Sequence, residues 1–358
     1  TITLLSTDNT FDDLTISAGT VTLATAVVVT NALTISGGTF AKSTFAITSA
    51  GSLTMSGGDL TSTSGAVAIT GAVNISSALS AIDFGSETWT ISGAWTNAST
   101  DGTVWEAGSG TITFDSATGG TMTFAGSNLA EAEFNNVTFN SSAVASQTFT
   151  MATRGLSWSG TLTITGDTIL AKATFTLGAE ASGALTVGGA GTNALTSTSG
   201  AVTVTTVSIS GTGDYIDLGS EAWTVSGTWT NATTSASWDT GTGTVTFTSA
   251  TGGTMTWGNP GEAEFNDVSF TPSSGTPTFT SSTNNLRAIG TVAVSTSATL
   301  AMGTLNIEFD RLDVNGTMTM DGITIPNIDI DGSAGVIVVT AWTLYSITSG
   351  GVPDIRWT

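Results

Sequence analysis

The stretches LTISAG (Leu14–Gly19), LTISGG (Leu33–Gly38) and LTMSGG (Leu53–Gly58) decide the fold of this chain. Each consists of an apolar residue, a threonine, a second apolar residue and a short turn that ends in glycine. Their starts lie 19 and 20 residues apart, and the related phrase Val73-Asn74-Ile75 follows after another 20. Repeats of about 20 to 50 residues are typical of stacked architectures, in which each unit buries its apolar side against the next.

The composition predicts an all-β protein. Thr, Ser and Gly dominate, 44 of the 358 residues are glycine, and only 9% are charged, so strong helix formers such as Lys, Glu and Gln are scarce. Short strands bounded by Gly and Ser turns favour a right-handed parallel β-helix (β-solenoid) with roughly 20-residue rungs, in which alternate residues point inward. The alternative is a string of tandem β-sandwich modules of about 130 residues.

A longer repeat overlies the short one. GSETWTISGAWTNAS (Gly85–Ser99) recurs as GSEAWTVSGTWTNAT (Gly219–Thr233), and EAEFNNVTF at Glu131 recurs as EAEFNDVSF at Glu262. The phrase Phe-[Asn/Asp] marks each module start, at Phe11, Phe134 and Phe265. We therefore predict module 1 at residues 1–133, a duplicated module 2 at 134–264, and a partial module 3 at 265–358 that includes a C-terminal cap or assembly segment.

Several classes of function are disfavoured by composition. The chain has no Cys and no His, so it lacks the commonest metal ligands and the commonest general base. Its net charge of −21 repels polyphosphate, which predicts no nucleic-acid partner. No apolar run reaches the length of about 18 residues that spans a bilayer, so we expect no membrane insertion. The start at Thr1, with no leader, suggests a processed secreted protein or a piece of a longer one.

Paired carboxylates are the best candidates for catalysis, because parallel β-helices can host glycoside-cleaving enzymes. The pairs are Glu131/Glu133 and Glu262/Glu264, with Asp12/Asp13 at the equivalent position of module 1. A catalytic site is normally assembled once, whereas these acids recur with the module. We therefore predict a structural role for them and a protein that is not an enzyme.

An acidic cluster near the C-terminus suggests calcium. Carboxylate oxygens are the ligands that Ca²⁺ prefers, although the spacing here is not that of a twelve-residue calcium loop. The alternative is that these acids are solvated surface charges; no other cofactor is expected. The hypothesis places the ion at Asp313, Asp329 and Asp331, with Asp310 and Asp321 nearby.

Three further motifs recur. Six tryptophans repeat at the module period (Trp89, Trp95, Trp105, Trp223, Trp229 and Trp238), and we expect them to fill the core rather than to stack on sugars. Thr-x-Thr phrases are those of ice-binding solenoids, but the varying rung length is expected to break a flat array. Asn-x-Ser/Thr sequons lie at Asn74, Asn97, Asn136, Asn140, Asn231 and Asn315.

The phrases GTWTNATTSASWDTGTGTVTF, SATGGTMTW and FNDVSF resemble the repeats of large bacterial and archaeal secreted surface proteins, which are commonly adhesin-like β-solenoids. The resemblance covers most of residues 85–270 and implies an extracellular or cell-surface location. We expect a structural protein, the subunit of a filament, fibre or surface stalk. The alternatives are a carbohydrate-binding adhesin with surface glycans as partners, and a viral fibre or decoration protein.

Self-association is the partner prediction. Open-ended β-helices expose strand edges that can add strands from a neighbour, so we expect a head-to-tail homopolymer. Continuation of both ends into a longer polypeptide is the alternative. The predicted assembly residues are Thr1, Ile2 and Leu4 near one end, and Val336, Val338 and Trp342 near the other.

Overall fold

A computed structural model describes most of the chain. The described residues are 2–4, 9–100, 105–125, 132–141, 143, 145–178, 183–258, 264–305, 307–308, 311–314, 317–320, 323–325, 336–339 and 342–344. They form β-strands and turns and no α-helix, so they include no helix able to cross a membrane. The chain divides into two compact units, Thr1–Thr196 and Ser197–Thr358. This division falls inside the predicted module 2, and the module boundaries themselves stay a prediction.

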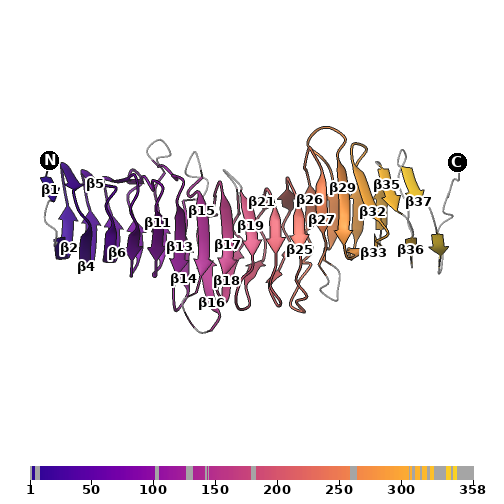
Figure 1. Cartoon of the computed structure of the whole chain (residues 1–358), viewed down its shortest axis with the longest axis horizontal. Coiled ribbons are helices and arrows are strands. Elements are labelled where there is room, and N and C mark those ends of the chain that lie inside the picture. The colour runs from indigo at the N-terminus through magenta and orange to yellow at the C-terminus, as the bar shows by residue number, and fades with distance from the viewer. Residues whose placement is uncertain are drawn as a thin grey trace. The chain divides into compact units, whose positions relative to one another are not determined.

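Both units are parallel β-solenoids with rungs of about 22 residues. In each unit the strands of successive rungs lie side by side (Figure 1). The strands of the first unit are β1 (Ile2–Leu4), β2 (Asn9–Ile16), β3 (Thr20–Leu23), β4 (Val27–Ile35), β5 (Thr39–Ser43), β6 (Ile47–Met55), β7 (Asp59–Ser62), β8 (Val67–Ile69), β9 (Val73–Ile75), β10 (Ala81–Ile82), β11 (Thr88–Ile91), β12 (Trp95–Asn97), β13 (Thr111–Asp115), β14 (Gly120–Thr123), β15 (Asn136–Asn140), β16 (Gln147–Met151), β17 (Thr161–Thr165), β18 (Thr168–Ala173), β19 (Ala184–Val187) and β20 (Ala194–Ser197).

The second unit has the same pattern of short strands and turns, and it begins with Ser197, the last residue of β20. Its strands are β21 (Val202–Val204), β22 (Val207–Ile209), β23 (Tyr215–Ile216), β24 (Trp223–Val225), β25 (Trp229–Asn231), β26 (Thr244–Phe247), β27 (Gly253–Thr256), β28 (Asp267–Phe270), β29 (Thr278–Thr283), β30 (Leu286–Arg287), β31 (Thr291–Val294), β32 (Thr299–Gly303), β33 (Ile307–Glu308), β34 (Arg311–Val314), β35 (Thr317–Met320), β36 (Ile323–Ile325), β37 (Val336–Val339) and β38 (Trp342–Leu344).

The repeat that opens the sequence marks the rungs, as predicted. Leu14 pairs with Leu33, Leu33 with Leu53, and Leu53 with Val73, in parallel register. The pairing then passes from Val73 to Trp95. Neighbouring parallel strands lie about 4.8 Å apart, so these residues form one column, and all but Leu14 are fully buried. Parallel stacking replaces the antiparallel hairpins that a β-sandwich would need.

The core of each unit is a set of such columns. Phe114 on β13 stacks on Phe139 on β15 with ring centroids 5.1 Å apart, and Phe247 on β26 stacks on Phe270 on β28 at 5.2 Å. Inward and outward residues alternate, as in the buried–half-buried pattern of β13 and β26. The stacking of like residues explains why the sequence repeats: each rung offers its neighbour a matching apolar surface.

Candidate functional site: a duplicated buried carboxylate

Glu133 is the centre of a polar cluster inside the first unit. Its Oε1 atom accepts hydrogen bonds from Trp95 Nε1 at 3.2 Å and Asn97 Nδ2 at 2.8 Å, both on β12. Its Oε2 atom accepts a third from the backbone N–H of Ala125 at 2.8 Å. The backbone carbonyl of Glu133 accepts from Trp105 Nε1 at 2.9 Å. The carboxylate therefore links β12 to the backbone at Ala125, which follows β14 in the next rung.

Glu264 repeats this arrangement in the second unit. It accepts hydrogen bonds from Trp229 Nε1 at 2.7 Å, Asn231 Nδ2 at 2.9 Å and the backbone N–H of Gly258 at 2.9 Å. Its carbonyl accepts from Trp238 Nε1 at 2.8 Å. The correspondence extends to every donor, so the duplicated W-T-N and A-E-F phrases encode one polar cluster twice.

The asparagine of each W-T-N phrase works in two directions. While its amide nitrogen donates to the glutamate, its oxygen accepts a backbone N–H: Ser99 N to Asn97 Oδ1 at 2.8 Å, and Thr233 N to Asn231 Oδ1 at 3.0 Å. Both asparagines are fully buried. They are therefore inaccessible in the folded chain, although both belong to glycosylation sequons.

Burial controls the ionisation of this cluster. The pKa of Glu264 is raised to about 7, because burial penalises the charged carboxylate more than the hydrogen bonds from Asn231, Trp229 and Gly258 stabilise it. A raised pKa alone would suggest a catalytic acid. Here both carboxylate oxygens accept hydrogen bonds from N–H donors of the described residues, and the side chain is buried. The arrangement suits a structural tie.

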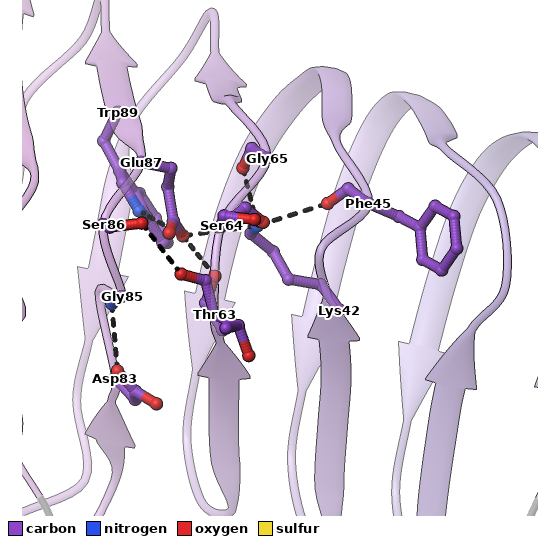
Figure 2. A network of polar contacts seen from close by, with 11 residues as sticks. Lys42, Phe45, Thr63, Ser64, Gly65, Asp83, Gly85, Ser86, Glu87 and Trp89 are labelled. Carbon is purple, nitrogen blue, oxygen red and sulfur yellow. Dashed lines mark hydrogen bonds and ion pairs between the residues drawn. The ribbon is translucent and has the colours of Figure 1, made fainter.

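A second buried acid, Glu87, forms an ion pair with Lys42. Lys42 Nζ lies 3.2 Å from Glu87 Oε1, and both side chains are buried. The same nitrogen donates to the carbonyls of Ser64 at 2.6 Å, Gly65 at 2.6 Å and Phe45 at 3.2 Å (Figure 2). Burial lowers the pKa of Lys42, and the Coulombic attraction of Glu87 opposes that shift. The lysine thus joins the turns of three neighbouring rungs.

The oxygen of Glu87 that faces Lys42 accepts two further hydrogen bonds. Ser62 Oγ donates to Glu87 Oε1, and Trp89 Nε1 donates to the same oxygen at 3.2 Å. Glu87 also lines a cavity of about 10 Å³, which is room for about one water molecule. In the second unit Ser197 Oγ donates to Glu221, the counterpart of Glu87 in the duplicated phrase. The serine–glutamate contact is therefore also duplicated.

Sequence reasoning missed the buried lysines. FAKSTF around Lys42 and LAKATF around Lys172 are a repeated phrase, and in both the lysine is fully buried. Each lysine donates to the carbonyl three residues ahead in the sequence. Lys42 donates to Phe45 at 3.2 Å, and Lys172 donates to Phe175 at 3.0 Å. The signal was present, because a lysine that recurs at the module period in so uncharged a chain is not random surface.

The phrase Phe-[Asn/Asp]-[Asn/Asp] has a physical meaning. Its third residue accepts the backbone N–H that begins a strand of the next rung: Thr161 N to Asn136 Oδ1 at 2.9 Å, and Thr291 N to Asp267 Oδ1 at 2.6 Å. Asp13 accepts the backbone N–H of Ala32, which lies inside β4 of the next rung, at 3.1 Å. These acids and amides align rungs, and Asp12 and Asp13 are exposed rather than parts of a pocket.

The six recurring tryptophans are buried, as expected. Trp89, Trp95, Trp105, Trp223 and Trp229 are at most 2% exposed, and Trp238 is 6% exposed. Their rings meet other core aromatics, for example Trp95 with Phe134 at 5.5 Å and Trp229 with Phe265 at 5.3 Å. They therefore offer no ring face to a sugar.

The remaining predicted site residues are reached only in part. Asp313 lies on β34, where its backbone pairs with Ala293, while Asp329 and Asp331 lie outside the described residues, as do Glu131, Glu262 and Thr1. Among the residues that the structure describes, no group of three or more His, Cys, Asp or Glu side chains could hold a metal ion. The calcium hypothesis stays a prediction.

The predicted assembly residues other than Thr1 lie on strands. Ile2 and Leu4 belong to β1, and Ile2 is 62% exposed. Val336 and Val338 lie on β37 and Trp342 on β38, which pair in parallel with β35 and β36.

Comparison of the chain with protein-family models, curated proteins and solved structures gives no significant match, so the sequence and the geometry alone carry the functional argument.

Proposed function

We propose that this protein is an extracellular structural protein, the subunit of a filament, fibre or surface stalk. One observation carries the proposal: the residue types that would perform chemistry recur with the repeat and are used to join rungs. Glu133 and Glu264 are enclosed by N–H donors, and Lys42 is enclosed by carbonyls and Glu87. The buried polar side chains of such a protein hold neighbouring rungs together.

The secreted location rests on the sequence. The Thr, Ser and Gly composition, the low charge density and the W-T-N…G-T-G-T-V-T-F…F-N-D-V-S-F phrases resemble surface proteins that act outside the cell. The burial of the periodic tryptophans argues against a carbohydrate-binding adhesin, because buried rings cannot stack on sugars.

Self-association is the second part of the proposal. Within the described residues β1 pairs on one side only, with β3, and presents the exposed side chain of Ile2. At the other end of the sequence, β37 and β38 each pair with one described strand. An open parallel edge can accept a strand from a second copy, and two different edges that fit each other give a head-to-tail contact.

The test measures polymer formation. Purified full chain is examined by light scattering and by negative-stain electron microscopy over a range of concentrations, next to Ile2→Asp and the control Leu79→Asp. Leu79 is also exposed, at 71%, but lies in a turn. We expect polymers from the wild type and from Leu79→Asp, and loss of polymers with an unchanged circular dichroism spectrum in Ile2→Asp. A full chain that stays monomeric at high concentration would refute assembly through this edge.

A further inference from the structure

Five neighbouring strands of the first unit place a threonine at the same outward position. Thr90 on β11 pairs with Thr113 on β13, Thr113 with Thr138 on β15, Thr138 with Thr163 on β17, and Thr163 with Thr186 on β19. All five side chains are half-buried, as expected for the outer surface of a sheet. Each is therefore one rung spacing from the next.

A second rank runs parallel to the first, two residues earlier on each strand. It consists of Thr88, Thr111, Asn136, Thr161 and Ala184; Thr88 pairs with Thr111, Thr111 with Asn136 and Thr161 with Ala184, while the side chain of Asn136 accepts the backbone N–H of Thr161. The two ranks together form what we call the threonine face. Eight of its ten residues are threonine and none is charged, although the chain has a net charge of −21.

The face is regular even though the rungs are not equally long. The rungs in this sheet are 23 or 25 residues long, counted from Trp89 through Ile112, Val137 and Leu162 to Leu185. The pairing of these strands nevertheless has no register shift. The extra residues lie in the turns. Unequal rungs, which we expected to break a flat array, therefore leave the register of this sheet intact. Hydroxyls repeat about 4.8 Å across the strands and about 6.6 Å along them.

We propose that the threonine face binds ice. Each threonine presents a hydroxyl and a methyl group, and its β-branched side chain has few rotamers, so the array is held in place by the backbone ladder. A neutral grid of hydroxyls with two fixed repeats can order water into the two-dimensional pattern of a crystal face. Its ten residues include no aromatic ring for a sugar and no charged side chain for a mineral or an anionic polymer; one acid, Asp115, borders the face two residues after Thr113 on β13.

The second unit supplies a natural contrast. Its corresponding strands β24, β26, β28 and β31 also run in register, but the ranks are interrupted by Asp267, Ser269 and Ala293. Thr246 on β26 occupies the position of Thr113 on β13, in TVTF and TITF respectively. Both are half-buried and outward, so Thr246 is the matched position for a control substitution.

The experiment measures thermal hysteresis and inhibition of ice recrystallisation by the full chain. Thr113→Lys places a long charged side chain in the middle of the threonine face, and Thr246→Lys is the matched control. We expect activity in the wild type, its loss in Thr113→Lys with an unchanged circular dichroism spectrum, and its retention in Thr246→Lys. No hysteresis or recrystallisation inhibition in the wild type, an equal loss in both variants, or retained activity in Thr113→Lys would each overturn the proposal. Binding to crystalline cellulose or chitin in place of ice would overturn it too.

Discussion

At the scale of single residues, the fold depends on a few buried polar side chains whose partners come from other rungs. Removing a partner from such a group leaves an unsatisfied donor or an uncompensated charge in the core, which costs more than the loss of an exposed contact. Glu264 with Asn231, and Glu87 with Lys42, are the clearest cases. Their positions, rather than exposed residues, are where substitutions are expected to be most damaging.

The first prediction concerns pH. The carboxyl of Glu264 has an ordinary pKa of 4.5 and one of about 7 in the fold, so the fold binds its proton more tightly than the unfolded chain does. The stabilising contribution is full below about pH 4.5 and is lost as the pH rises through about 7, a change of about 3 kcal/mol. Urea unfolding of wild type and Glu264→Gln should show a stability difference that falls by this amount over that range.

Glu106→Gln is the matched control for this prediction, because it is the same substitution at an exposed position. It measures the effect of the same substitution outside the core, against which the change in Glu264→Gln is compared. A flat difference for Glu264→Gln would mean that the buried carboxyl does not titrate between the two values.

The second prediction concerns the buried ion pair. Lys42→Met leaves Glu87 without its cation in the core, and breaking a buried pair from one side costs about 3–5 kcal/mol. Lys42→Met/Glu87→Gln removes the uncompensated charge and should recover part of that loss. The free energy of unfolding from urea titration measures both. A double variant no more stable than Lys42→Met would mean that the lysine acts through its bonds to carbonyls alone.

At the scale of elements, the turns set how closely rungs stack. Gly19 and Gly38 occupy the same turn in successive rungs with φ of 71° and 73°, a region that favours glycine. A Cβ on Gly19 would meet nothing within 4 Å, whereas a Cβ on Gly38 would lie 2.2 Å from the carbonyl oxygen of Gly19. The two positions share the backbone requirement and differ only in the neighbour.

The third prediction uses this pair. Gly19→Ala should cost about 1–2 kcal/mol, the ordinary penalty of the left-handed conformation. Gly38→Ala should cost clearly more, because the backbone of the adjacent turn must move. Thermal unfolding of both variants measures the difference. Equal melting temperatures would mean that the turns are free to separate and do not control the stacking distance.

At the scale of the whole chain, the dominant physical property is the net charge of −21. Like charges repel one another across the folded surface, and salt at 0.1 M largely screens the repulsion between exposed charges more than about 10 Å apart. Cations should therefore stabilise the protein in general. A specific calcium site would add to this effect and would depend on particular acids.

The fourth prediction separates the two effects. At constant ionic strength, replacing NaCl by CaCl₂ should raise the melting temperature if Asp329 and Asp331 hold calcium, and Asp331→Ala should abolish that rise. Asp12→Ala, which removes an exposed acid, should leave it intact. Equal melting temperatures in the two salts would leave these aspartates as plain surface charges.

The periodicity of the sequence predicts the solenoid, the alternation of inward and outward side chains, and the rung length to within a few residues. The reason is that stacked rungs must present matching surfaces, so periodicity is written in the order of residues, as in Leu14, Leu33, Leu53 and Val73. The burial of the recurring tryptophans follows from the same logic. A repeated large apolar residue has a repeated place in the core.

Only the tertiary structure decided what the polar residues do. Glu133 receives its hydrogen bonds from Trp95 and Asn97, some 36 to 38 residues earlier, and Lys42 meets Glu87 across 45 residues. Such distances in sequence carry no local pattern, so the contacts emerge only when rungs are placed on one another. The threonine face was hidden for the same reason: unequal rungs look irregular along the chain, but turns absorb the extra residues while the backbone hydrogen-bond ladder keeps the strands in register.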